Sequence, residues 1–424
     1  MIDRTVAPAS QKIDSYILPH ASTVQLDKGM NLHTLLLGTQ DVIRLEVIFK
    51  AGNWYEEQTG LAHFTSKMLG EGTSKNSAKD IQDKFAFYGA FMELNSGMDN
   101  ASITIYTLSK YLDHILPLIY ELFSDAQFPE NELENMRNIT LQGLKVNMEK
   151  TAFLAGTRFR ELLFGAEHPY GRFLSEEAIN KIEVKDLKSF YQKHYTSGSF
   201  DIFISGNGKE DFEKSIRSHF KRNTNETISA PGKIDSAPFS KQREVIEKEG
   251  SMQSSIRMGK KLFTINHEDY YKVYFLNEIL GGYFGSRLMQ NIREDKGYTY
   301  GIHSSVVTHK SDGYFVIGTD VKREFTQQTI DEIYKEIRRL KTEKVGAEEL
   351  ENVRNYMLGS FVNSISTPFA IADKFKTIYL NGMDYSFYEK YFNTISTMSS
   401  TDLFETAQKY FQEEQLLEVV AGGI

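Results

Sequence analysis

The sequence has 424 residues, which is enough for two domains of about 200 residues, each with its own hydrophobic core. Its 40% hydrophobic and 25% charged residues, with only 8 prolines, are typical of a folded globular protein and not of a disordered chain. The absence of cysteine excludes disulfides, thiolate metal sites and cysteine nucleophiles.

The net charge of −8 is spread along the chain, which argues against nucleic acid and against an anionic membrane as the main partner. The first residues lack the apolar stretch of a secretory signal, and no run of about 18 apolar residues occurs anywhere. We therefore expect a cytoplasmic protein without a membrane span.

Apolar periodicity predicts the same kinds of element in both halves of the chain. Alternation over 43–49 and 103–105 predicts half-buried strands, and apolar residues at three- and four-residue spacing over 112–119 predict an amphipathic helix. Residues 314–316 and 330–340 repeat the pattern of strand and helix in the second half. The sequence thus predicts an α+β fold.

The chain also repeats itself. ELENMRN, starting at Glu132, matches ELENVRN, starting at Glu349, in six of seven positions, and TAFLAGTRF at 151 matches TPFAIADKF at 367. FISGNG at 203 corresponds to VVAGGI at the C-terminus. Residues 222–242 have the Ser, Thr, Asn, Pro and Gly content of a linker. We expect two homologous halves, 1–229 and 230–424, with the boundary near Ala230.

Three polar residues, His63, Ser66 and Lys67, lie at positions i, i+3 and i+4 of a helix predicted after Gly60, and their spacing predicts a shared helix side. Their flanks, GLAHF and MLGEGT, resemble the insulinase and pitrilysin family of zinc peptidases, in which H-x-x-E-H binds zinc through two histidines and activates water through the glutamate. Only His63 matches this motif. Ser66 stands at the general-base position and Lys67 at that of the second histidine, so neither can do the expected chemistry.

The third zinc ligand of that family is a glutamate in an R-x-x-x-L-E-E-I stretch. The corresponding segment here places Gln142 and Gly143 at the acidic pair. The resemblance therefore implies a chain that binds no zinc of its own. His63 is then a packed or solvated residue. Lys67 has two interpretations: a fixed cation in the place of zinc, paired with Glu71 or Glu149, or, more simply, a solvated lysine.

The second half preserves a different family signature. GGYFGSRLMQNIREDKGYTY, starting at Gly281, resembles G-G-x-x-S-R-L-x-x-x-x-R-E-x-x-G-x-x-Y, whose arginine and tyrosine contact substrate in active members. The matching residues are Arg293 and Tyr300, with Gly297 at an expected turn from helix to strand. Guanidinium and phenol donors suit a peptide carbonyl and its developing oxyanion. The alternatives are a capping or ion-paired arginine and a core tyrosine.

Two further residues are candidates for substrate binding. Arg287, in the glycine-rich part of the same signature, is expected to position its loop or to touch peptide backbone. Asn95, in ELNSGMDNASITIY, resembles the family's sheet-edge segment, where an extended peptide adds as a strand; the alternative is an ordinary turn asparagine.

The resemblance covers the chain from about Ile43 to the C-terminus. It implies two α+β halves facing each other like a clamshell around a chamber, and a non-catalytic, peptide-binding subunit of a heteromeric zinc metallopeptidase. A homologous partner carrying H-x-x-E-H would supply the zinc, and this chain would have no peptidase activity alone, although it could form a homodimer. The alternative is a structural or peptide-holding protein without a catalytic partner. A hydrolase with an unrelated site is disfavoured, because neither a G-x-S-x-G elbow nor a cysteine is present.

Overall fold

The computed structural model describes residues 13, 15–208, 212–220, 232, 234 and 243–424. The predicted boundary at Ala230, and almost all of the predicted linker, lie outside these residues. None of the helices in the described part of the chain is long and apolar enough to cross a membrane.

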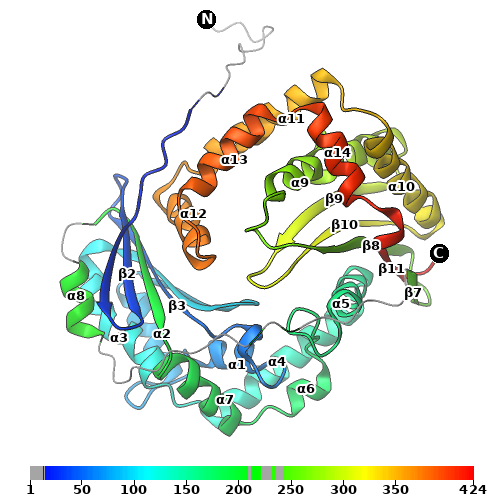
Figure 1. Ribbon diagram of the computed structural model, residues 1–424. Coiled ribbons are helices and arrows are strands. Elements are labelled where there is room, and N and C mark those ends of the chain that lie inside the picture. Colours follow the sequence, from blue (N-terminus) through cyan, green and yellow to red (C-terminus); the bar gives the residue numbers. More distant parts are fainter. Residues whose placement is uncertain (1–12, 14, 209–211, 221–231, 233, 235–242) are drawn as a thin grey trace, which may run out of the picture.

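The first half contains a six-stranded sheet and the helices packed on it (Figure 1). Its elements are β1 (Ser22–Asp27), β2 (Met30–Leu36), β3 (Val42–Phe49), η1 (Asn53–Tyr55), α1 (Leu61–Met68), α2 (Ala78–Phe87), β4 (Phe91–Ser96), β5 (Ala101–Leu108), η2 (Ser109–Tyr111), α3 (Leu112–Ser124), α4 (Glu130–Met148), α5 (Thr151–Phe164), α6 (Glu176–Asn180), α7 (Val184–Tyr191), η3 (Gln192–Thr196), β6 (Phe200–Gly206) and α8 (Phe212–His219).

The second half contains a five-stranded sheet with its own helices. Its elements are β7 (Arg243–Glu247), β8 (Gln253–Leu262), α9 (Tyr270–Asn277), η4 (Glu278–Gly282), η5 (Met289–Asp295), β9 (Thr299–Thr308), β10 (Gly313–Lys322), η6 (Arg323–Phe325), α10 (Thr326–Thr342), α11 (Ala347–Asn363), α12 (Pro368–Leu380), α13 (Ser386–Thr397), α14 (Ser400–Tyr410), η7 (Glu413–Gln415) and β11 (Leu417–Gly422).

The two sheets have the same topology. The first has the order β1-β2-β6-β3-β5-β4, and the second, β7-β11-β8-β10-β9, reproduces it without an equivalent of β1. In each, the last strand in sequence pairs in parallel with a strand near the start of that half: β6 with β2, and β11 with β7. The other neighbours pair antiparallel. The prediction of an α+β fold with two homologous halves facing each other is confirmed.

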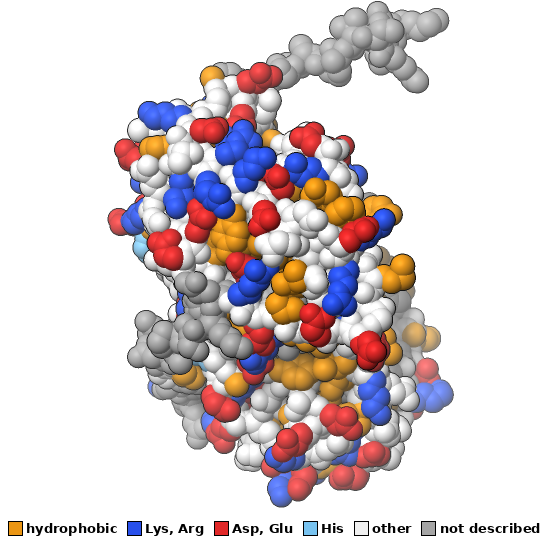
Figure 2. All heavy atoms as spheres, turned by 90° about the vertical axis from the view of Figure 1, so that its right-hand side faces the viewer, with side chains coloured by type: hydrophobic (Ala, Val, Ile, Leu, Met, Phe, Trp, Pro, Cys, Tyr) orange, Lys and Arg blue, Asp and Glu red, His pale blue; other side chains and the backbone are white. Residues whose placement is uncertain are grey.

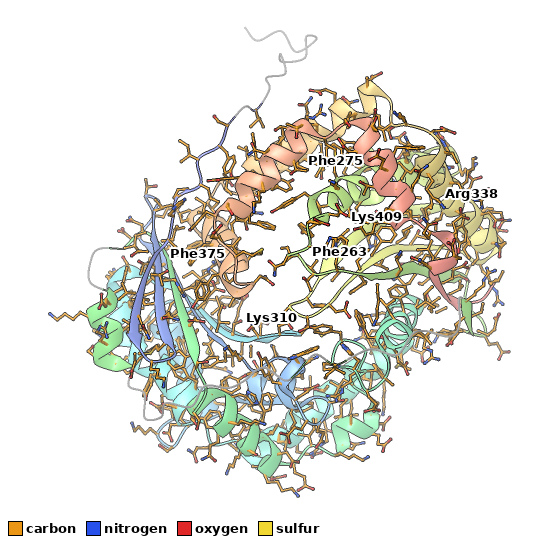
Figure 3. All side chains as sticks on the ribbon, viewed as in Figure 1. Phe263, Phe275, Lys310, Arg338, Phe375 and Lys409 are labelled. Atoms are coloured by element: carbon orange, nitrogen blue, oxygen red, sulfur yellow. The ribbon has the colours of Figure 1, made fainter. Side chains whose placement is uncertain are left out.

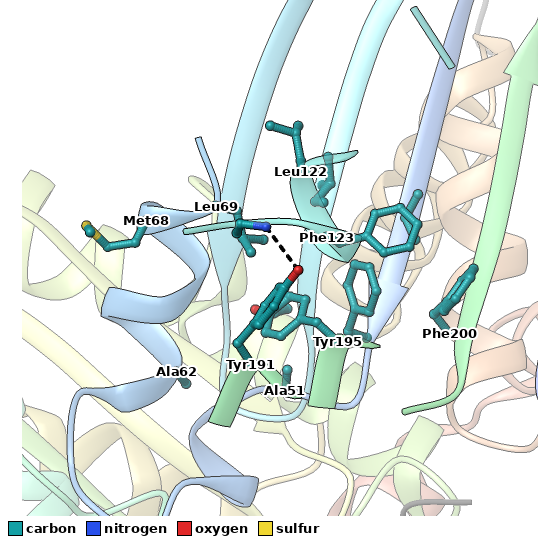
Figure 4. Close-up of a cluster of buried hydrophobic side chains, with 14 of the residues drawn as sticks. Ala51, Ala62, Met68, Leu69, Leu122, Phe123, Tyr191, Tyr195 and Phe200 are labelled. Atoms are coloured by element: carbon teal, nitrogen blue, oxygen red, sulfur yellow. Dashed lines mark hydrogen bonds between the residues drawn. The ribbon is translucent and has the colours of Figure 1, made fainter. Parts of the chain in front are cut away.

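Burial follows position in the sheet. The central strand β3 is almost wholly buried from Ile43 onward, whereas the edge strand β4 alternates exposed and half-buried residues. Aromatic side chains fill the first core beneath α1 and α7 (Figure 4). There the Tyr191 hydroxyl accepts a hydrogen bond from the Ala126 amide at 3.1 Å, so that even this polar atom is satisfied.

Each half places one helix on the sheet of the other. Helix α5 of the first half contacts β8 and β11, and α12 of the second half contacts β2 and β6. These helices begin in the two repeated segments at 151 and 367, so the exchange follows the internal duplication. N-terminal residues also cross over, since the Ala21 amide donates to the Tyr385 hydroxyl at 2.8 Å.

Buried ion pairs fasten α12 to the first sheet. The guanidinium of Arg44 on β3 is held by Asp373 at 2.8 and 3.2 Å and by Glu46 at 3.1 Å. Lys376 completes the group, 2.7 Å from Glu46 and 2.9 Å from Asp373. Because Arg44 is buried, the carboxylates are needed to offset the cost of removing its charge from water.

A second contact lies where two hairpin ends meet. The tip between β9 and β10 donates the Lys310 amide to the Asp99 carboxylate at 3.0 Å, and the Tyr170 hydroxyl donates to the same carboxylate at 2.6 Å. Figure 3 shows Lys310 next to the first half, on the side of the hairpin away from the second-half helices. The halves are thus tied at more than one place.

The surface carries charges of both signs. On the face shown in Figure 2, acidic and basic side chains are interspersed among small apolar areas. This distribution agrees with the even spread of charge along the sequence.

Candidate functional site

Helix α1, which carries the altered zinc motif, is capped by a carboxylate. Gly60 takes φ +101° at the N-cap, and the Oε2 atom of Glu56 accepts the amides of Gly60 at 3.1 Å and Ala62 at 3.0 Å. Glu56 is only 6% exposed, and its Oε1 atom has no hydrogen-bond partner among the residues that the structure describes. Burial raises the pKa of Glu56 to about 7, although the two amides and nearby Arg172 oppose that change.

The structure separates the three motif residues of α1. His63 and Lys67 are half-buried, but Ser66 is 1% exposed and faces the hydroxyl of the buried Tyr195. The sequence-based expectation of one shared polar side is therefore wrong for Ser66. Ser66 lies four residues after Ala62 and three before Leu69, on a side that is buried in the core.

Lys67 is held by backbone. Its Nζ atom donates to the carbonyl of Leu94 on β4 at 2.6 Å. The carboxylates considered as partners are not used: Glu149 pairs with Lys248 at 2.7 Å, and Glu71 has a raised pKa because of burial and the nearby Glu132. The ammonium group thus fixes α1 to the outermost strand of the first sheet.

The chemistry of these side chains does not fit zinc. Burial lowers the pKa of His63, and the charge of Lys67 lowers it further, so the imidazole stays neutral beside a cation that would repel a metal ion. Gln142 and Gly143 lie exposed on α4 and offer no carboxylate. Across the residues that the structure describes, no three histidine or carboxylate side chains converge as a metal-binding group.

Asn95 lies on β4, the edge strand of the first sheet, where it pairs with Ser102 of β5 and is exposed. The prediction of a sheet edge at this segment is confirmed, and the interpretation as a turn asparagine is wrong. The outer side of such a strand offers unpaired backbone groups to an added strand.

Arg293 lies on η5 and is about one-third exposed. Its NH1 atom donates to Glu294 at 2.7 Å, and its guanidinium lies 4.6 Å from the ring centroid of Phe284. Gly297 follows with φ +65°, a left-handed conformation that glycine adopts without strain, and β9 begins two residues later. The predicted turn from helix to strand is confirmed.

Tyr300 lies at the start of β9, the edge strand of the second sheet, and is 96% exposed. The alternative of a core tyrosine is therefore wrong. Its ring lines a cavity of about 920 Å³ to which both halves contribute, through residues 149–152 of the first half and 251–253 and 322–324 of the second. Local sequence patterns do not predict this cavity, because its walls come from distant segments.

Arg287 is engaged elsewhere. Its Nε and NH2 atoms both donate to the Glu349 carboxylate at 2.8 Å, and its side chain is largely buried. Glu349 begins the second copy of the repeated ELEN segment on α11. Of the two expected roles, positioning the glycine-rich loop agrees with this pairing.

The structure does not bring the two groups of candidate residues together. His63, Ser66 and Lys67 lie beside β4, while Arg293 and Tyr300 lie at η5 and β9. Among the described residues, no hydrogen bond or ion pair joins one group to the other.

Comparison with known proteins shows the family. Residues 38–162 match the model of the insulinase family, peptidase family M16, and residues 181–357 match that of the peptidase M16 inactive domain. The chain belongs to the insulinase (M16) family. It is a two-domain member of the non-catalytic type, as the sequence predicted.

Relatives of similar length carry names of both kinds. An uncharacterized zinc protease, YmxG of Bacillus subtilis, is 25% identical over 73% of this chain and 76% of its own. A Helicobacter pylori protein named "Non-peptidase homolog YmxG" is 24% identical over 85% of this chain and 84% of its own.

Solved structures show the same fold. A Pseudomonas fluorescens protein described as a peptidase M16 inactive domain has a TM-score of 0.85 at 23% identity, with 95% of this chain and 98% of that chain covered. The periplasmic protease PqqL of Escherichia coli has a TM-score of 0.76 at 14% identity. The match includes 99% of this chain and 48% of the PqqL chain. This M16 chain thus corresponds in fold to about half of PqqL.

Proposed function

We propose that this M16 chain is the non-catalytic, substrate-binding subunit of a heteromeric zinc peptidase that acts on peptides or unfolded segments. The observation that carries the proposal is the exposure of Tyr300. A tyrosine that is 96% exposed at the start of an edge strand adds nothing to a core, and it belongs to the one signature that the chain keeps almost complete.

Arg293 and Tyr300, the arginine and tyrosine of the retained signature, carry donors that suit a peptide carbonyl. One nitrogen of Arg293 is bound to Glu294, which leaves the other guanidinium donors for a ligand, while the ring of Phe284 limits how far the side chain can swing. The ion pair with Glu294 is partly exposed and so contributes little that a bound peptide would have to replace. Together with the Tyr300 hydroxyl, these donors would hold the carbonyl and stabilise negative charge that develops on its oxygen.

The reaction itself would need a second subunit. Helix α1 offers Lys67 and a buried Ser66 where a zinc ligand and a base are required, so a homologous partner with an intact H-x-x-E-H motif would supply the zinc and the nucleophile. The fold of this chain corresponds to about half of PqqL, which agrees with a complete peptidase built from two such chains. The isolated chain could form a homodimer in the same arrangement, but neither of its subunits would carry an H-x-x-E-H motif.

The test is to mix the purified chain with a family member from the same cell that carries H-x-x-E-H and to measure cleavage of an unstructured peptide. Activity should appear only in the mixture, and Tyr300→Phe and Arg293→Met should each lower kcat/KM by about tenfold to a hundredfold. Arg338→Met is the matched control, because Arg338, labelled in Figure 3, is an exposed arginine on α10 that pairs with Glu413 and does not line the Tyr300 cavity.

Two results would contradict the proposal. Peptidase activity of the isolated chain would mean that it has a catalytic site of its own, outside α1. No activity in any mixture, with the peptide still bound, would favour the structural or peptide-holding alternative.

A further inference from the structure

The helical layer of the second half contains a cavity that the proposed function does not use. It measures about 300 Å³ and lies among α9, α11, α12 and α13 (Figure 1), with Ile265, Ser360, Ser364 and Thr377 completing its wall. The Tyr300 cavity lies elsewhere and shares no lining residue with it. Six aromatic rings make up most of this wall: Tyr270, Tyr274, Phe361, Phe387, Tyr388 and Tyr391.

The rings hold one another in place. Tyr274 lies 6.2 Å from Tyr391, and Tyr391 lies 5.3 Å from Phe361, between ring centroids. Phe387 contacts Tyr388 edge-on at 5.1 Å. These are ordinary distances for aromatic pairs, so the wall is fixed and offers ring faces and edges to a further aromatic group.

Three hydroxyl groups of this wall have no partner of their own. In the part of the chain that the structure describes, the hydroxyls of Tyr270, Tyr274 and Tyr391 form no hydrogen bond, whereas that of Tyr388 donates to the Lys374 carbonyl at 2.9 Å. Burial raises the pKa of Tyr270 to about 12 and raises those of Tyr274 and Tyr391 as well. The hydroxyls therefore stay protonated and can donate.

A cation without an acidic partner completes the wall. The Nζ atom of Lys374 on α12 lies 5.8 Å from the Phe361 ring centroid and 6.0 Å from that of Tyr388. None of the described carboxylates lies within ion-pair distance of it, because the neighbouring Asp373 points to Arg44 and Lys376. Burial lowers the pKa of Lys374 in spite of Asp373, so the ammonium is incompletely compensated.

We propose that this cavity binds a small aromatic carboxylate, with the ring among the tyrosines and the carboxylate at Lys374. An anion there would offset the charge of Lys374 and accept hydrogen bonds from tyrosine hydroxyls, while the ring would bury its apolar area against the aromatic wall. The volume suits a single ring with a short acidic arm. Glu278 lies near Tyr274 and Tyr391 but does not line the cavity, and burial raises its pKa to about 7, so its repulsion of the anion falls as the pH drops below 7.

The test is calorimetric titration of the full-length chain with 3-phenylpropionate, 3-phenylpropanamide and 3-phenylpropylamine, which differ only in charge at one end. The carboxylate should bind with a Kd of about 1 mM, and the amide and amine about tenfold more weakly or not at all. A short peptide ending in phenylalanine distinguishes two sources of the same chemistry. Tighter binding of the peptide than of 3-phenylpropionate assigns the cavity to peptide C-termini, and weaker binding assigns it to free acids.

Variants separate the cavity from general charge effects. Lys374→Met should weaken the carboxylate about tenfold and leave the amide unchanged. Lys390→Met should change neither, because Lys390 is exposed and lines the adjacent cavity around His267. Tyr391→Phe keeps the ring and removes one donor, and it should weaken the carboxylate by a smaller factor. Thermal melting shows that each variant is folded.

The proposal is overturned if the three probes bind alike, if the amine binds best, or if Lys374→Met and Lys390→Met have equal effects. It is also overturned if no saturable binding of the carboxylate or the peptide appears below about 10 mM.

Discussion

Replacing Glu56 with glutamine tests the electrostatics of the cap on α1. The Glu56 side chain is buried and accepts two amides through one oxygen, while its other oxygen has no partner in the described part of the chain. Glutamine keeps an acceptor for the amides of Gly60 and Ala62 and removes the charge. Its effect on stability should therefore depend on pH.

The sign and size follow from the pKa, which burial raises from 4.5 to about 7. The folded protein holds the proton more tightly than the unfolded chain. This stabilisation is fully present below pH 4.5 and is lost as the pH rises through 7. A change of about 2.5 pKa units corresponds to roughly 3 kcal/mol. Glu56→Gln should thus match the wild type near pH 4 and exceed it by up to about 3 kcal/mol near pH 8.

Urea unfolding at several pH values measures this difference. Trp54, the only tryptophan, is buried two residues from Glu56 and reports on this segment by fluorescence. Glu57→Gln is the matched control. Glu57 is exposed and paired with Lys193, which lowers its pKa, so its replacement should cost little and any pH dependence should have the opposite sign. A constant difference in stability between Glu56→Gln and the wild type from pH 4 to pH 8 would mean that Glu56 does not titrate with a raised pKa.

Three further predictions concern other charged groups. Burial lowers the pKa of His194 to about 4, while its Nδ1–H donates to the Lys50 carbonyl, so the neutral imidazole contributes stability that should be lost as the pH falls from 6.5 through 4. His194→Gln should flatten this part of the urea-unfolding profile, and an unchanged profile would contradict the prediction. Asp373→Asn removes a carboxylate from buried Arg44 and should lower the free energy of unfolding by roughly 1–3 kcal/mol in the same assay. Replacement of the exposed Asp384 by Asn should lower it much less, and equal losses would argue against the ion-pair group as a link between the halves. Lys67→Met removes the cation next to His63 and should raise the pKa of His63 in an NMR titration, although burial keeps that pKa below its ordinary value. An unchanged pKa would mean that the charge of Lys67 does not act on His63.

The sequence predicted what local patterns and repetition encode. The strands around Ile43 and Ile103, the helix after Leu112, and the turn at Gly297 appear where apolar spacing and glycine placed them. The duplication can be read from the sequence because the two ELEN segments share most of their residues. In the structure, Glu349 of the second segment accepts two hydrogen bonds from Arg287.

Contacts between distant segments could not be predicted in this way. Nothing near Lys67 in sequence indicates that its partner is the carbonyl of Leu94, and helical spacing alone did not show that Ser66 faces Tyr195. The packing of α5 and α12 on each other's sheets has the same cause, since it depends on how the halves assemble. Asn95 was assigned correctly to a sheet edge only through the family resemblance, because its local sequence also fits a turn.

The central claim is that α1 and α4 of this M16 chain lack the chemistry to hold zinc, so that catalysis needs a partner. The most direct measurement is the zinc content of the purified full-length chain after dialysis against buffer with added zinc, by atomic emission. The wild-type chain should hold far less than one zinc per chain, and His63→Ala should hold the same amount. One tightly held zinc per chain that is lost in His63→Ala would contradict the claim.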